Sequence, residues 1–133
     1  MTHIIATVSK IQNSDSLNIV NFDFNGITLS MMSLDLNENI KIGTKVKLNC
    51  KSSHIAIAKN FSGEVSYSNR LSCEIQSIEN GELLSSIHLK IFDTILESII
   101  TVNSSKKMNL KVGDNITAFI KASELSILEV LND

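Results

Sequence analysis

The sequence predicts an all-β protein built as two tandem five-stranded OB-like small β-barrels. Apolar and polar residues alternate in short runs, which is the pattern of half-buried strands. One segment recurs 70 positions further along the chain. The longest stretch that could form a helix is a turn or two, so we expect strands to make up nearly all of the regular structure.

The repeat divides the chain. Residues 39–57 and 109–127 share their apolar positions, and residues 4–11 match 71–78 at a spacing of 67. The identical pairs at the larger spacing are Asn39/Asn109, Lys41/Lys111, Gly43/Gly113, Lys51/Lys121 and Ser53/Ser123. Such self-similarity indicates a duplicated structural unit. We therefore assign residues 1–60 to a first repeat, 61–69 to a linker and approach to the second repeat, and 70–133 to the second repeat.

In the first repeat we expect a polar turn at 12–16 and a tight hairpin at Asn25-Gly26, because both residues tolerate positive φ. A crossover with at most one helical turn should follow at 34–42 and close at Gly43. The expected strands of this unit are 4–11, 17–24, 27–33, 45–53 and 55–59, the last completing the same barrel.

The second repeat should follow the same order. Its strands begin with 71–78, a strand around 87–91 and 95–102, and a crossover at 103–112 precedes the fourth strand. The hairpin at Phe92-Asp93-Thr94 should be about one residue longer than its counterpart in the first repeat.

Composition excludes several classes of protein. A formal charge of −2 and a pI near 5.9 give no basic field for a phosphate backbone, and 43% hydrophobic residues exclude wholesale disorder. The N-terminus lacks the pattern of a signal peptide, and no apolar run approaches a membrane span, so we expect a soluble, cytoplasmic protein.

The reactive residue types form no catalytic or metal-binding pattern. Cys50 and Cys73 stand at apolar positions of strands and should be buried, reduced thiols. His3, His54 and His88 have no partner at metal-ligand spacing. We expect no enzyme activity, no catalytic residue and no metal site.

Hydrogen-bond donors gather where strands of the second repeat end, at 99–104, at 120–123 and just before the first strand at 66–70. Hydroxyls, an amide, a Lys and backbone N–H groups suit a tetrahedral oxyanion, which needs many donors. Turn capping is the alternative explanation for hydroxyls at strand ends.

Two segments resemble a known family. Residues 100–104 read Ile-Thr-Val-Asn-Ser, similar to the Ile-Thr-x-x-Ser of the molbindins, and 110–123 contain Leu-x-x-Gly followed by Ala-x-Ile-Lys-Ala-Ser. This Mop or TOBE-type domain also forms part of molybdate-responsive regulators and of the ATPases of molybdate transporters. Tandem copies over essentially the whole chain resemble its two-repeat members.

The resemblance implies a protein that binds molybdate or tungstate as a ligand, without a covalent cofactor, for intracellular storage, homeostasis or sensing. Carried over by position, the oxyanion-binding residues would be Thr101, Ser104, Lys121, Ala122 through its N–H, Ser66 and Asn69, with Ser33, Lys51 and Ser52 in the first repeat. The chain departs from the family at Ser68, where an Arg is expected, at Glu124, where a second Ser is common, and at Leu36, which replaces a Ser-like ligand. Whether the first repeat binds an anion stays open.

The resemblance also implies a homo-oligomer, with a trimer favoured over a dimer, and a link to a molybdate transporter or regulator. The alternative function is that of a single-stranded nucleic-acid-binding OB-type module. That function needs a basic groove and exposed aromatic residues. The negative charge and the inward-alternating Phe residues argue against it, so we expect no nucleic-acid partner.

Overall fold

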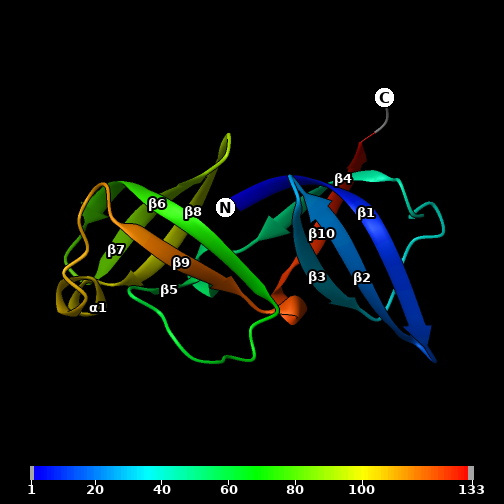
Figure 1. Cartoon of the computed structure of the whole chain (residues 1–133), viewed down its shortest axis with the longest axis horizontal. Coiled ribbons are helices and arrows are strands. Elements are labelled where there is room, and N and C mark those ends of the chain that lie inside the picture. Colours follow the sequence, from blue (N-terminus) through cyan, green and yellow to red (C-terminus); the bar gives the residue numbers. More distant parts are fainter. Residues whose placement is uncertain (1, 132–133) are drawn as a thin grey trace.

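The structure, a computed structural model, describes residues 2–131. Its strands form two five-stranded antiparallel sheets that curl side by side along the long axis of the molecule (Figure 1). The longest helix of the described residues has six residues, and none of their helices has the length and apolar character needed to cross a membrane. The predicted fold of two small OB-like barrels is confirmed.

The strands follow the predicted order. The first half contributes β1 (Thr2–Ser14), β2 (Leu17–Phe24), β3 (Ile27–Ser33), β4 (Lys45–Cys50) and β5 (Ala56–Ala58). The second half contributes β6 (Asn69–Asn80), β7 (Leu84–Ile91), β8 (Thr94–Thr101), β9 (Asn115–Ile120) and β10 (Ser126–Leu131). The helical pieces are the 3₁₀ turns η1 (Ser52–His54) and η2 (Ala122–Glu124) and the helix α1 (Val102–Lys107).

The two crossovers differ in structure. The crossover between the third and fourth strands has 11 residues in the first half (34–44) and 13 in the second (102–114). Helix α1 lies in this longer crossover, whereas 34–42 contains no helix. The fourth strand predicted at 45–53 was too long, because β4 ends at Cys50 before the 3₁₀ turn η1.

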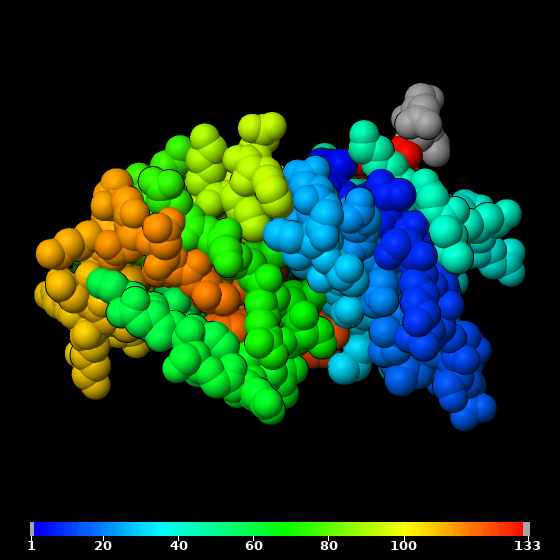
Figure 2. Space-filling view, viewed as in Figure 1, coloured from blue at the N-terminus to red at the C-terminus, as the bar shows by residue number. Residues whose placement is uncertain are grey.

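The hairpins correct one prediction. Asn25 and Gly26 take φ values of 49° and 92°, as the predicted turn requires. The second hairpin is not longer, because Ile91 pairs with Thr94 as Phe24 pairs with Ile27. Phe92 has a φ of 54°. Its ring packs edge-on against that of Phe24, with 5.5 Å between the ring centroids. The tips of the two hairpins therefore meet where the two halves join (Figure 2).

The fifth strands are exchanged between the halves. β5 pairs with β9 of the second sheet, and β10 pairs with β4 of the first. The prediction that 55–59 completes the first barrel is therefore wrong. Each repeat offers the same edge to a fifth strand, and the turns η1 and η2 direct both strands across the junction. A fifth strand that paired within its own repeat and one that pairs with the other repeat, as observed, would both cover sheet edges that are otherwise unpaired.

A matched pair of clamps fastens each half to the other half's third strand. The Asn69 amide accepts from the Ser30 N–H (2.7 Å) and donates to the Ser30 carbonyl (3.0 Å). At the equivalent positions, Thr2 Oγ1 accepts from the Glu97 N–H (2.9 Å) and donates to the Glu97 carbonyl (3.4 Å). Since β3 and β8 lie at sheet edges, each clamp satisfies outward-facing backbone groups of one edge residue.

The core combines the inward faces of both sheets. Its largest fully buried side chains include Phe22, Leu48, Leu71 and Leu89. Both cysteines are buried and unpaired, as predicted. Burial raises the pKa of Cys50 to about 11 and that of Cys73 to about 12, so both are neutral thiols at neutral pH.

Candidate oxyanion-binding site

A depression of about 400 Å³ lies where the two halves meet on the second sheet. It reaches from the end of β8 to the turn η2. Residues of both halves line it: Ser53, His54, Ile55, Ala56, Tyr67, Ile99, Ile100, Lys121 and Glu124. Its apolar lining includes Ile99 and Ile100 of β8, and its polar lining includes Ser53 and His54 of η1 and Glu124 of η2, so a ligand here would contact both repeats.

Lys121 provides the cation of this depression. It follows β9 directly and begins η2 in an extended conformation, which points the chain back over the junction. Its ammonium makes no hydrogen bond or ion pair within residues 2–131, and its side chain lines the depression. Ala122 behind it is buried and anchors the turn. An unpaired Lys on an anchored turn is suited to hold an anion as a point charge.

Glu124 and His54, which both line the depression, contact each other. The Nδ1 atom of His54 lies 2.7 Å from Oε2 of Glu124, and each side chain is 38% exposed. The two residues stand at equivalent positions of the two repeats, 70 apart, so the contact joins one repeat to the other. Lys51 and Ser123 line a smaller adjoining hollow with them.

Thr101 and Ser104 lie apart from Lys121 within one chain. They open α1 at the outer end of the second half, whereas the turn after β9 lies at the junction (Figure 1). Thr101 Oγ1 accepts from the Ser104 N–H (3.1 Å) and donates to Ser104 Oγ (3.0 Å), so the pair caps the helix. Ile100 is the residue that connects this cap to the depression.

The remaining predicted ligands of the second repeat take different places. Ser66 is exposed in the linker, whose aromatic residues Phe61 and Tyr67 pack on Phe119 of β9 at 5.1 and 5.3 Å. Asn69 is fully buried, and both polar atoms of its amide hydrogen-bond to Ser30. Its side chain therefore serves the junction in this structure.

The hydroxyls of the first repeat are engaged inside the protein. Ser33 Oγ donates to the Asp35 carbonyl at 2.6 Å, and Ser52 Oγ donates to Glu97 Oε1 at 2.8 Å. Lys51 is exposed. The groove beside Ser33, of about 450 Å³, is also lined by Asp35, whose carboxylate would repel a dianion, and by Glu129, which pairs with Lys47 at 3.0 Å.

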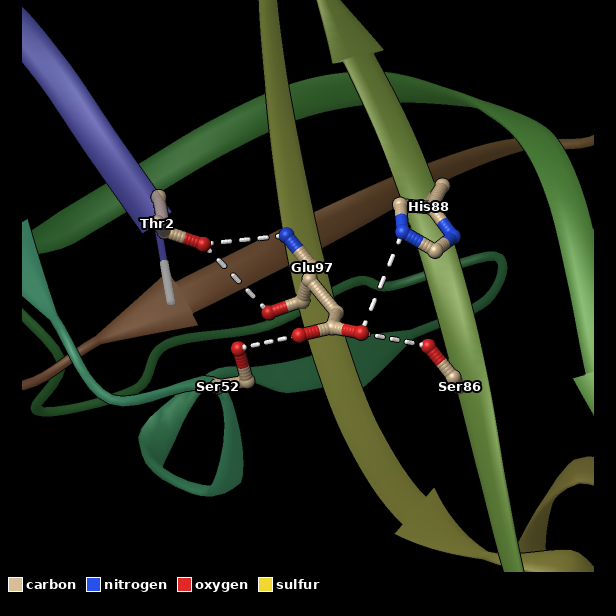
Figure 3. Close-up of polar contacts among 5 residues, drawn as sticks. All are labelled: Thr2, Ser52, Ser86, His88 and Glu97. Atoms are coloured by element: carbon tan, nitrogen blue, oxygen red, sulfur yellow. Dashed lines mark hydrogen bonds and ion pairs between the residues drawn. The ribbon is translucent and has the colours of Figure 1, made fainter.

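Glu97 is the centre of a polar cluster that sequence reasoning did not identify. Ser86 donates to its Oε2 at 2.7 Å, His88 Nε2 lies 3.8 Å away, and Thr2 binds its backbone (Figure 3). Hydrogen bonds from Ser86 and Ser52 hold the pKa of the Glu97 carboxyl below its ordinary value. The sequence contains a pattern that could have indicated the contact of His54 with Glu124, because a histidine and an acidic residue stand at equivalent positions of the two repeats.

The aromatic side chains do not form a stacking platform. Phe22, Phe24 and Phe119 are buried, and the partly exposed rings of Phe61, Tyr67 and Phe92 each pack on one of these buried rings. A base-stacking surface needs exposed rings along a basic groove. The structure therefore gives the nucleic-acid alternative no support.

Known proteins share this sequence pattern and fold. The model of the TOBE domain family matches residues 66–127. A probable molybdenum-pterin-binding protein of Haemophilus influenzae is 32% identical over 65 residues, which are 48% of this chain and 94% of the relative. The structure also resembles that of the cytoplasmic molybdate-binding protein ModG with molybdate bound, with a TM-score of 0.89 and 23% identity over 94% of this chain and 93% of ModG. That likeness extends over both halves and shows a common fold.

Proposed function

This chain belongs to the family of TOBE-domain molybdenum-pterin-binding proteins, and on that premise we propose that it binds molybdate as a ligand without catalysing a reaction. The carrying observation is the unpaired ammonium of Lys121 in a depression at the junction of the halves. A dianion there would receive a charge-assisted hydrogen bond, which is stronger than a neutral one. Lys121 and Ala122 both lie inside the segment that matches the TOBE model.

The separation of the donors supports a site shared between subunits. Lys121 and Ala122 lie at the junction, and the hydroxyls of Thr101 and Ser104 lie at the outer end of the second half. One chain would then offer two partial donor sets, which a neighbouring chain completes. We propose a homo-oligomer on this ground, a trimer in preference to a dimer.

Tungstate should bind at the same place, since it is a tetrahedral dianion of nearly the same size as molybdate. Reversible binding without chemistry suits intracellular storage or homeostasis of the anion. A sensing role would add a protein partner, such as a molybdate transporter or regulator, to the same binding event.

Calorimetric titration of the purified protein with molybdate, tungstate, sulfate, phosphate and a single-stranded oligonucleotide tests the proposal. We expect saturable binding of molybdate and tungstate, much weaker binding of sulfate and phosphate, and no binding of the oligonucleotide. Sulfate bound as tightly as molybdate would overturn the assignment. Light scattering with and without molybdate measures the oligomer, and a strict monomer that binds the anion at full affinity would contradict the shared site.

A further inference from the structure

The depression that contains Lys121 also contains a carboxylate. Glu124 follows Lys121 by three residues, and both side chains line the same cavity. At neutral pH their charges cancel, and a carboxylate near a bound dianion repels it. An anion site with this composition needs a second positive charge.

His54 stands where that charge is needed. Its Nδ1 atom lies 2.7 Å from the Glu124 carboxylate, and its side chain lines the same cavity as Lys121. Because a carboxylate only accepts, a hydrogen on Nδ1 would bridge this contact, and a proton added at Nε2 would make the imidazole cationic. The other titratable groups around the pair are Lys51 in the adjoining hollow, Tyr67 on the cavity wall and the buried thiol of Cys50.

We propose that His54 is a positioning residue of the anion site, which offsets the charge of Glu124 and takes up a proton when the dianion binds. This inference rests on the proposed function and assigns to the first repeat a part in the second repeat's site. The proton comes from the solvent, and no bond other than the new N–H of the imidazolium forms. Glu124, which departs from the family pattern, is then tolerated because its partner comes from the opposite repeat.

A double-mutant cycle tests the pairing. We compare the wild type, His54→Gln, Glu124→Gln and the double variant by calorimetric titration with sodium molybdate at pH 7. His54→Gln should weaken binding about tenfold, because Glu124 is left without its counter-charge. Glu124→Gln should strengthen binding several-fold, and His54→Gln should then cost little in the Glu124→Gln background. Equal losses from His54→Gln in both backgrounds would overturn the inference.

Proton uptake gives a readout that a merely structural role would not move. Titrations in PIPES and in imidazole buffer, whose ionisation enthalpies differ, should show an uptake of up to one proton per anion in the wild type. His54→Gln should abolish this uptake, and His3→Gln, which alters an exposed histidine of β1, should leave it unchanged. Thermal unfolding of each variant checks that it is folded.

The outcomes separate the two proposals. If the wild type binds no molybdate at any pH between 6 and 8, the proposed function is wrong. If it binds molybdate with no proton uptake and with the affinity of His54→Gln, the function stands and the role of His54 is wrong.

Discussion

The two repeats share a fold and differ in what their polar groups are free to do. In the second repeat the Lys121 ammonium is unpaired within the described chain and lies in an open depression. In the first repeat, Ser52 donates to Glu97 and Ser33 donates to a backbone carbonyl. The comparison teaches that matching residue types at equivalent positions do not establish two equivalent sites. What each donor already contacts decides whether it is available to a ligand.

The largest expected effect concerns the clamps. Asn69→Ala should destabilise the protein by about 2–4 kcal/mol, because the part-buried N–H and C=O of Ser30 both lose a partner. Thr2→Val should cost less, about 1–2 kcal/mol, because one of its two hydrogen bonds is already long at 3.4 Å. Urea unfolding of both variants measures the difference. Equal losses would show that the clamps are energetically equivalent.

A smaller effect, on binding, distinguishes the two lysines. Lys121→Ala should weaken molybdate binding by roughly 10–100-fold, which corresponds to about 1.5–3 kcal/mol for a charge-assisted hydrogen bond. Lys51→Ala should lose less, because the hydroxyl of the neighbouring Ser52 is engaged by Glu97. Parallel titrations compare them. Similar losses would mean that the first repeat binds an anion as well as the second.

Glu97 should make stability depend on pH at the acid end. Hydrogen bonds from Ser86 and Ser52 lower its pKa in the folded protein, so its contribution to stability is present above the pKa of the unfolded chain and is lost as pH falls through the folded pKa. Glu97→Gln should therefore be less stable than the wild type at pH 7, with the difference shrinking towards pH 3. Thermal unfolding across this range measures it, with Glu79→Gln in β6 as an exposed control. A difference that stays constant with pH would contradict this role.

The smallest expected effect is at the hairpins. Phe92→Asn should change the free energy of unfolding by less than about 1 kcal/mol, because two effects oppose each other. Asn tolerates the positive φ of 54° better than Phe does, but the edge-on contact with the Phe24 ring is lost. Asn25→Ala in the first hairpin should destabilise by about 1 kcal/mol, because Ala gains no contact that offsets its φ of 49°. Differential scanning calorimetry resolves the two. A large loss for Phe92→Asn would show that the ring contact is a main support of the junction.

Local sequence patterns predicted the strands well and their partners less well. Alternation and Asn25-Gly26 placed β2 and β3 at their observed bounds. The exchange of β5 and β10 could not be predicted from the sequence. Alternation identifies a strand and its inward face, but two similar repeats present two similar sheet edges with which that strand could pair. The hairpin at Phe92 was misjudged because a bulky residue with positive φ is rare and needs a tertiary contact, here with Phe24, to support it.

The sequence predicted which types of hydrogen-bond donor the candidate site would use, and only in part where these residues lie in the fold. Lys121 lies in a depression that contains residues of both repeats, and its role as a ligand stays a prediction. Asn69 was chosen for its chemistry, and its burial against Ser30 depends on the packing of the two halves, which no local pattern encodes. His54 was set aside for want of a metal-ligand partner, and its actual partner is a carboxylate 70 residues away.

The exchange of β5 and β10 between the halves affects how the protein folds and unfolds. β10 pairs with β4, and Ile127 lies opposite Leu48, so the first sheet is complete only after the last strand has been made. A chain made from its N-terminus must therefore leave the β4 edge of its first sheet unpaired until β10 has been made. The same long-range pairing means that neither half can melt alone without opening the edge of the other. An anion that stabilises the junction would thus protect the whole chain against proteases, and not one repeat alone.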